Sequence, residues 1–372
     1  MTWMTNRAYR FRIYPNKDQR ILFAKTFGCC RFIYNQMLAD KKAAFEQTGK
    51  MQRITPAAYK KDHPWLKEVD SLALANTQLH LEAAFKRFFE VKGTGYPKFK
   101  SKHRSEKSYT TNLVNNNIRL EKGRIRLPKA GWVKIRQHRE IADGYCLRSV
   151  TVQMEPTGRY YASLLFEIPD HESQGSGVPA ERADILGIDF AMQGLAVFSD
   201  GSRADYPMYM KKSQDKLARA QRKLSRCQLG SRNYQKQKRR VALCHEKVRN
   251  QRKDFQHKLS RRLADTYDAI AVEDINMKAM SMGLKLGKGV MDNSYGSFRN
   301  MLAYKLEEQG KQLIYVDRFF PSSKRCSRCG SVKKELRLDE RVYRCACGNC
   351  MDRDINAAVN IREEGRRLMA AS

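Results

Sequence analysis

The segment DILGIDF, residues 184–190, decides the fold of this chain. Four of its seven residues are Ile, Leu or Phe, and a short, almost continuous apolar run of this kind is typical of a strand buried in a sheet. Asp189 lies inside the run, a setting too apolar for an acid that only faces solvent. The segment therefore predicts a buried strand that begins a domain, and its carboxylate, taken alone, fits either a functional acid or a paired acid of the core.

Similar apolar runs recur downstream. Residues 195–198 (LAVF) come before the turn residues at 199–201, residues 269–274 (AIAVED) contain Glu273, and residues 313–316 (LIYV) follow the end of a predicted helix. Because strands and helices alternate along this half of the chain, we expect an α/β domain.

The N-terminal half shows a different pattern. Residues 9–14 alternate basic and apolar side chains as a strand does, and Asn16 followed by Gln19 predicts the capped start of a helix. Short alternating segments return between residues 109 and 168. We expect a small β-barrel or curled sheet interrupted after its first strand by a helical insertion, and a linker rich in Gly and Ser over residues 170–180.

The charge balance points to a polyanionic partner. The chain has 372 residues, with 72 Lys and Arg against 39 Asp and Glu, a formal net charge of +33. Residues 208–262, predicted to form two helices separated at Gly230-Ser231, hold 19 Lys and Arg against three acids. Such a balance favours nucleic-acid binding, although composition alone would also fit a basic ribosomal or chromatin-type protein without catalytic activity.

The sequence gives no indication of a membrane segment. No apolar run reaches the ~18 residues that a membrane-spanning helix needs, and residues 1–12 lack the apolar core of a signal peptide. We therefore expect a cytoplasmic protein without a membrane partner.

Five of the ten cysteines lie between residues 326 and 350. Cys326 and Cys329 form a C-x-x-C-G knuckle, which places two thiolates within reach of one zinc ion. We favour Cys345 and Cys347 as the second pair, because Cys347 is followed by glycine as Cys329 is. Cys347 with Cys350 is the alternative, since it has the more usual two-residue spacing. Four cysteine ligands leave no open position, so one structural Zn²⁺ is predicted.

Three acids stand out in the α/β half. Asp189 and Glu273 lie in apolar strand segments, and Asp354 begins a predicted helix. Two strand acids and one helix acid can converge at a sheet edge, where three carboxylates can bind two Mg²⁺ ions and act on a phosphodiester. Asp352 lies only two residues before Asp354, so we expect it to cap the helix or to pair with Arg353.

The combined motifs resemble the TnpB (OrfB) proteins of insertion-sequence transposons, relatives of the compact type V CRISPR effectors. The resemblance covers essentially the whole chain. It is carried by Gly187-Ile188-Asp189 with Ser199-Asp200-Gly201, by Val272-Glu273-Asp274-Ile275-Asn276-Met277-Lys278, by Pro321-Ser322-Ser323-Lys324 with Cys326, Cys329 and Gly330, and by Asp352-Arg353-Asp354 with Asn356-Ala357-Ala358.

This resemblance implies an RNA-guided DNA endonuclease with a RuvC-type, RNase H-like catalytic domain. The family's catalytic acids correspond to Asp189, Glu273 and Asp354, with two catalytic Mg²⁺ ions and one structural Zn²⁺. The implied partners are a transposon-encoded guide RNA and double-stranded target DNA beside a short motif that the protein recognises. We expect a monomer in a bacterial or archaeal cytoplasm, associated with the nucleoid when bound to DNA.

The resemblance also implies an order of domains. The expected segments are the first strand of a wedge β-barrel (1–15), a helical recognition insertion (16–103), the rest of the barrel (104–169), a linker (170–183), the first part of the RuvC-like domain (184–321) with a basic helical hairpin (208–262), a zinc ribbon (322–350) and the final helix of the RuvC-like domain (351–372).

The chain departs from the family pattern at two points. Ala191 stands where the family usually has glycine, which could crowd the backbone near the metals, and the second knuckle is C-x-C rather than C-x-x-C. Neither departure removes a ligand. A repressor without nuclease activity and an accessory transposition protein are the alternatives, but a repressor of this kind would be expected to lack one of the three acids.

The basic helices are expected to contact nucleic acid. In the family context, residues 208–262 would line the channel that holds the guide–target duplex, with Arg239, Arg240, Arg249 and Arg252 as candidate phosphate contacts. The alternative is a solvated basic hairpin.

Overall fold

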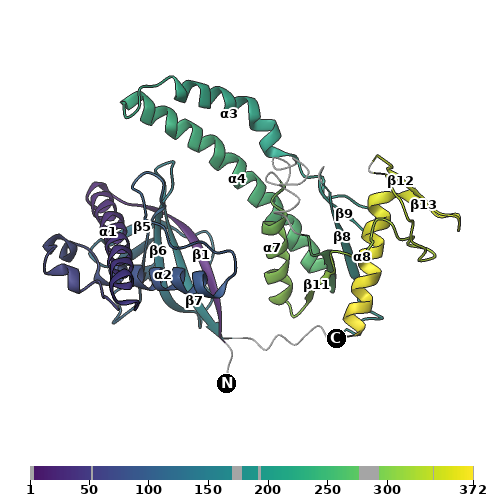
Figure 1. Ribbon diagram of the computed structural model, residues 1–372, viewed down its shortest axis with the longest axis horizontal. Coiled ribbons are helices and arrows are strands. Elements are labelled where there is room, and N and C mark those ends of the chain that lie inside the picture. The colour runs from purple at the N-terminus through teal and green to yellow at the C-terminus, as the bar shows by residue number, and fades with distance from the viewer. Residues whose placement is uncertain are drawn as a thin grey trace. The chain divides into compact units, whose positions relative to one another are not determined.

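The computed structural model describes residues 4–51, 53–169, 178–191, 194–275, 293–337 and 339–371. The chain divides into two compact units, residues 1–170 and residues 171–372 (Figure 1). None of the helices in these described ranges is both long and apolar enough to span a membrane.

The first unit is built on a seven-stranded antiparallel sheet in the order β2-β6-β7-β1-β5-β4-β3. Strand β1 lies inside it and pairs with both β7 and β5. Since β2 and β3 are edge strands, the sheet is open, which fits the expected curled sheet and not a barrel closed by hydrogen bonds. The strands are β1 (Met4–Tyr14), β2 (Lys107–Asn112), β3 (Arg119–Glu121), β4 (Arg124–Leu127), β5 (Gly131–Arg136), β6 (Cys146–Met154) and β7 (Tyr160–Pro169).

Helices are inserted between β1 and β2, as the sequence predicts. They are α1 (Lys17–Thr48), the short 3₁₀ turns Ala58–Lys60 and Pro64–Glu68, and α2 (Ser71–Glu90). The predicted capping box is present, because Asn16 and Gln19 exchange side-chain-to-backbone hydrogen bonds of 2.9 and 3.0 Å. The buried Phe23 ring of α1 lies 6.0 Å from Tyr109 on the sheet, so the helix packs on the sheet through aromatic side chains.

The second unit has a four-stranded sheet in the order β11-β10-β8-β9. Strand β10 is parallel to both β8 and β11, and β9 is antiparallel to β8. This arrangement confirms the α/β prediction and the buried character of residues 184–190. The strands are β8 (Ile185–Ala191), β9 (Leu195–Phe198), β10 (Ala269–Glu273) and β11 (Gln312–Val316).

Helices cover both faces of this sheet (Figure 1). Helices α4 (Arg232–Thr266) and α7 (Tyr295–Glu307) pack on one face with Leu186, Ile188 and Phe190 of β8. Helix α8 (Arg353–Ala370) packs on the other face, where Ile361 meets Ile185, Ala269 and Ala271. Because side chains alternate along a strand, the odd-numbered residues of β8 and β10 face α8.

Two glycines let α8 lie close against the strands. A Cβ atom on Gly187 would lie 2.1 Å from the carbonyl oxygen of Ala358, and one on Gly365 would lie 2.4 Å from the Cβ of Ala271. Both distances are far below van der Waals contact, so the helix can occupy this position only where a side chain is missing.

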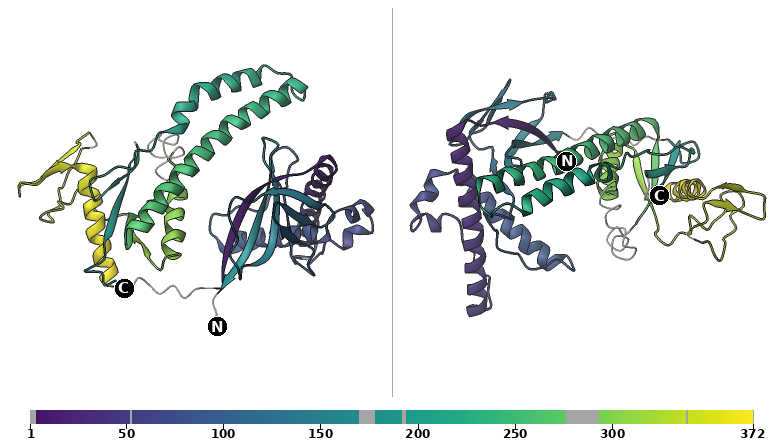
Figure 2. Two further views of the ribbon diagram at one scale, coloured as in Figure 1. Left: turned by 180° about the vertical axis from the view of Figure 1, so that it is seen from behind. Right: turned by 90° about the horizontal axis from the view of Figure 1, so that it is seen from above.

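Helix α3 (Tyr209–Ser225) and α4 form the predicted basic hairpin, and they run side by side in Figures 1 and 2. Ser231 caps α4 by accepting a 3.0 Å hydrogen bond from the amide of Tyr234. The break between the helices is therefore where the sequence predicts it.

The small cysteine-rich module contains a hairpin. Strand β12 (Val342–Arg344) pairs with β13 (Cys350–Asp352), so this hairpin encloses the second knuckle. Most of the predicted linker, residues 170–177, and the motif residues 276–278 lie outside the described residues.

We predict that Gly187→Ala lowers the free energy of unfolding by about 1–3 kcal/mol or more, because the added methyl group cannot fit between β8 and α8. The matched control is Gly296→Ala in α7, where an added Cβ meets no atom within 4 Å and should be neutral or slightly stabilising. Urea denaturation of both variants measures the difference, and equal stability would contradict the close packing.

Candidate active site

Strand register brings two of the predicted acids together. Val272 of β10 lies beside Ile188 of β8, so Glu273 and Asp189 occupy the next position on two neighbouring parallel strands. Both are odd-numbered and therefore face α8. Both are half-buried: Glu273 is the last residue of β10, and Asp189 lies two residues before the end of β8.

The third acid comes from the first turn of α8. Asp352 caps this helix, and its Oδ1 accepts hydrogen bonds from the amides of Asp354 (2.9 Å) and Ile355 (3.1 Å). The expected capping role of Asp352 is confirmed. Its ion-pair partner is Arg203 at 2.9 Å, whereas Arg353 donates to the carbonyl oxygens of Arg337 and Glu340.

The electrostatics place the three acids in one group. Burial, together with the nearby carboxylates of Glu273 and Asp354, raises the pKa of Asp189 to about 8, while Arg353 opposes the shift. Burial also raises the pKa of Glu273, an effect partly offset by a hydrogen bond from Ser322. Burial therefore disfavours the charged form of both strand acids, and at Asp189 the two neighbouring carboxylates add to this effect.

Several residues around the acids were not assigned a role from the sequence. The Ser322 hydroxyl donates to Oε1 of Glu273. Asp274, next to Glu273, forms ion pairs of 3.2 Å with Arg299 and Arg318. Ser322 belongs to a quoted motif, but its contact joins residues 49 positions apart, which no local pattern reveals.

Residue Ala191, where the chain departs from the family pattern, ends β8. Its carbonyl oxygen accepts a 2.7 Å hydrogen bond from the Tyr295 hydroxyl of α7. The last residue of β8 is thus joined to α7, on the face of the sheet opposite α8.

The cysteine module brings four thiols together. The sulfur atoms of Cys326, Cys329, Cys345 and Cys347 all lie within 4.8 Å of one another. The favoured second pair, and not the alternative with Cys350, is the one found in this group. Across the two knuckles, the sulfur atoms of Cys326 and Cys347 lie 3.7 Å apart and those of Cys329 and Cys345 lie 3.6 Å apart.

Two buried asparagines join this module to α8. The side-chain amides of Asn356 and Asn360 both donate 2.7 Å hydrogen bonds to the carbonyl oxygen of Arg325, immediately before the first knuckle. Asn356 also accepts from the Ser327 amide at 3.0 Å, and Asn360 donates to the Ser322 carbonyl at 2.8 Å. The first knuckle, the partner of Glu273 and the helix that carries Asp354 therefore form one hydrogen-bonded assembly.

The four arginines singled out on α4 do not share one environment. Arg239 and Arg240 are exposed, whereas Arg249 and Arg252 are half-buried. The first pair is therefore the better placed to meet a ligand in solution.

Comparisons with known proteins match separate segments of the chain to different family models. Residues 166–282 match the OrfB_IS605 family model, described as "Probable transposase", and residues 295–361 match the model described as "Cas12f1-like, TNB domain". A protein of Streptomyces pristinaespiralis named "Putative RNA-guided DNA endonuclease" is 34% identical over 98% of this chain and 90% of its own length.

The chain belongs to the TnpB (OrfB) family. Another similar TnpB relative, named "Putative RNA-guided DNA endonuclease InsQ", comes from Escherichia coli K12 and is 30% identical over 98% of this chain and 93% of its own length. Among solved structures, a Cas12f1–sgRNA–target DNA complex shares the fold, with a TM-score of 0.59 at 14% identity over 96% of this chain and 99% of that one.

One further match concerns the N-terminus of this TnpB chain. Residues 1–50 match a model described as "Helix-turn-helix domain". In the structure, residues 4–48 form strand β1 and the single 32-residue helix α1, so the match is one of sequence and not of a two-helix arrangement.

Proposed function

We propose that this protein is an RNA-guided DNA endonuclease that hydrolyses phosphodiester bonds of double-stranded DNA. The observation that carries the proposal is the convergence of Asp189, Glu273 and Asp354 on the α8 face of the sheet in a chain of the TnpB family. Carboxylates gathered at a sheet edge suit a RuvC-like site.

The donor set of this site fits Mg²⁺. Mg²⁺ prefers carboxylate oxygens, and a divalent cation would offset both the burial and the neighbouring carboxylates that raise the pKa of Asp189. Asp189, Glu273 and Asp354 are the residues that would hold two ions, which stabilise charge on the attacking and leaving oxygens of a phosphodiester. Two neighbouring residues would hold these acids in place. Ser322 orients Glu273, and Asp352 fixes the first turn of α8.

Pairs of basic side chains on neighbouring strands of the first unit also favour a polyanionic partner. On the sheet face opposite the core, Arg12 lies directly across from Arg136, and Lys134 lies across from Arg124. Like charges in such cross-strand positions are destabilising, and phosphates bound along this face would relieve the repulsion. We assign the guide RNA and the target DNA as the partners, with recognition of a short motif beside the target.

We predict that Asp189→Ala, Glu273→Ala and Asp354→Ala each abolish DNA cleavage and leave RNA and DNA binding intact, because each removes charge stabilisation worth several kcal/mol in the transition state. Plasmid cleavage with Mg²⁺ and gel-shift binding measure the two properties.

The matched control is Asp352→Asn, which keeps the capping oxygen and should reduce cleavage only mildly. Full cleavage activity in any one of the three alanine variants would show that the substituted residue is not catalytic. A wild-type complex that binds RNA and matching DNA but never cuts would instead support a repressor.

We further propose that Cys326, Cys329, Cys345 and Cys347 hold one structural Zn²⁺. Four thiols within 4.8 Å of one another match the ligand set of closed zinc sites. Through Asn356 and Asn360, the ion would stabilise the start of α8 and hence the position of Asp354.

We predict one zinc per chain by metal analysis, and loss of that zinc in Cys345→Ser together with faster amide exchange in α8, because structural zinc binding is coupled to local folding. Cys350→Ser is the matched control and should keep the metal. The opposite pattern, with zinc lost from Cys350→Ser and kept by Cys345→Ser, would overturn this choice of ligands.

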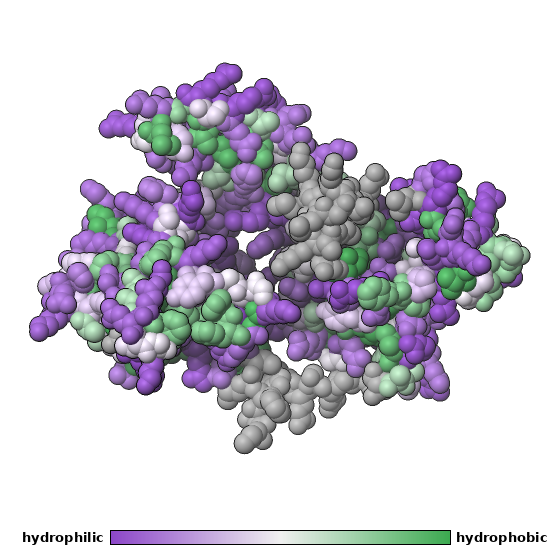
Figure 3. Space-filling model, in the orientation of Figure 1, coloured by the Kyte–Doolittle hydropathy of each residue, from purple (hydrophilic) through white to green (hydrophobic). Residues whose placement is uncertain are grey.

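The basic hairpin is proposed to bind the phosphate backbone of the guide–target duplex. The face of α3 and α4 in view in Figure 3 is mostly hydrophilic. Phosphate contacts release counterions, so each should add to the salt dependence of binding irrespective of sequence.

We predict that Arg239→Gln with Arg240→Gln weakens binding equally for all targets that match the guide, and that it flattens the plot of log affinity against log salt by roughly 0.7–0.9 per lost contact. The half-buried Arg249 and Arg252, tested as a second pair, should have a smaller effect on the slope.

The control is Lys258→Gln with Arg261→Gln on the same helix. These residues already pair with Asp254 and Asp265 at 2.8 and 3.4 Å, so little phosphate binding should be lost. An unchanged slope for the Arg239 and Arg240 variant would mean that these side chains face only solvent. A loss confined to some target sequences would mean that they recognise bases.

A further inference from the structure

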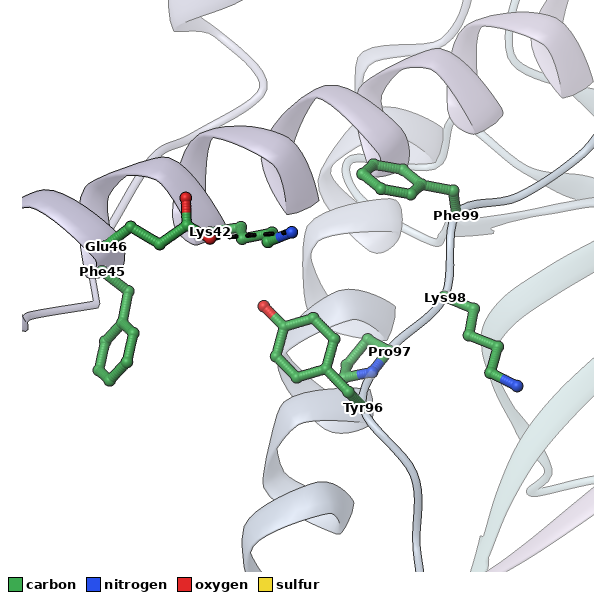
Figure 4. Close-up of a pocket in the computed structure, with 7 residues that line it drawn as sticks. All are labelled: Lys42, Phe45, Glu46, Tyr96, Pro97, Lys98 and Phe99. Atoms are coloured by element: carbon green, nitrogen blue, oxygen red, sulfur yellow. Dashed lines mark ion pairs between the residues drawn. The ribbon is translucent and has the colours of Figure 1, made fainter.

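An open cleft is lined by residues of the first unit, whereas the three acids and the four clustered cysteines belong to the second unit. It has a volume of about 580 Å³, within the range of ligand sites. One side comes from α1 and the other from the irregular segment that follows α2 (Figure 4). The lining residues are Lys42, Phe45, Glu46, Tyr96, Pro97, Lys98 and Phe99.

The wall formed by residues 96–100 is held firmly, although it has no regular secondary structure. Asn35 of α1 donates to the carbonyl oxygen of Lys100 at 2.9 Å and accepts from its amide at 2.7 Å. The Lys100 ammonium also lies 4.0 Å from the centre of the Tyr34 ring. The end of this wall is therefore attached to α1, the helix that forms the other side of the cleft.

Three aromatic rings at this cleft remain accessible to solvent. Phe45, Tyr96 and Phe99 are 54%, 43% and 59% exposed. The Tyr96 ring is supported by edge-to-face contacts with Phe85 at 5.5 Å and Phe88 at 5.4 Å. Single exposed aromatics are common on proteins, but three around one cleft indicate a binding surface.

The charge of the neighbouring segment of the chain, residues 86–107, indicates what kind of ligand binds in the cleft. Residues 86–107 contain eight Lys and Arg, two Glu and four Phe and Tyr. At the cleft edge, Lys42 and Glu46 form an ion pair of 3.8 Å, and Lys98 points outward on the flank (Figure 4). Aromatic rings among positive charges are the chemistry that binds single-stranded nucleic acid. The same charge would repel a second copy of this chain.

We propose that this cleft binds an unpaired nucleotide, with its base against Phe45, Tyr96 and Phe99 and its phosphates near the surrounding lysines. The proposal rests on the proposed function, because an RNA-guided nuclease meets unpaired nucleotides in its RNA and in the displaced DNA strand. Base stacking depends little on sequence, since every base offers a flat face. The cleft would thus bind a strand irrespective of its base sequence.

The test uses the full-length protein and short oligonucleotides of one sequence, as single-stranded RNA, as single-stranded DNA and as a duplex, in buffer without Mg²⁺. About 0.5 M salt suppresses the phosphate contacts made elsewhere. Each single strand is also made with abasic positions. The variant is Phe45→Ala with Phe99→Ala, and the control is Phe89→Ala, which truncates an exposed ring (68%) outside the cleft lining.

We expect the double variant to bind the intact single strand roughly five- to a hundred-fold more weakly than the wild type. It should bind the abasic strand as the wild type does, because the variant and the abasic strand remove the same contact. Phe89→Ala should match the wild type on every strand. Preference for the RNA or the DNA strand would identify which of them supplies the nucleotide, and either result supports the site.

Equal loss on intact and abasic strands, or no loss, would overturn the proposal. So would self-association of the wild type that the double variant abolishes while oligonucleotide binding stays unchanged, because the cleft would then be a contact between copies. Guide-dependent cleavage is measured on the same preparations. Active wild-type enzyme with no base-dependent binding at the cleft would refute this inference alone, whereas loss of guided cleavage in the wild type would refute the proposed function.

Discussion

The close contact between α8 and β8 is the constraint on which the second unit depends. Because Gly187 has no side chain, the backbone of α8 lies directly on the strand, and this sets the height of the helix above Asp189 and Glu273. An extra methyl group would move Asp354 away from the other two acids. The glycine of the Gly-Ile-Asp motif is thus explained by packing, while the aspartate two residues later faces the same helix.

A second constraint joins the cysteine module to that helix. Hydrogen bonds from Asn356 and Asn360 to the backbone around Arg325 mean that the first knuckle and α8 move together. The hydroxyl of Ser322, in the same short segment, contacts Glu273. The module that follows β11 is therefore a support for the acids as well as a separate small fold.

Much of this arrangement follows from local patterns in the sequence. Apolar runs predict β8 and β10, alternation predicts which residues share a face, and the glycine after Cys347 favours the pair found in the thiol cluster. The pairing of Arg203 with Asp352 could not be predicted, because it joins residues 149 positions apart. The choice between a closed barrel and a curled sheet stayed open for a related reason: short alternating segments indicate strands but not whether the last one closes on the first.

The position of Asp354 along the chain has a consequence for synthesis. Ribosomes make β8 and β10 well before α8, so a nascent chain can display Asp189 and Glu273 while the third carboxylate is still missing. Within the proposed mechanism, polypeptides that end before α8 are translated without a complete catalytic centre. Such aborted translation products would then be unable to cut DNA.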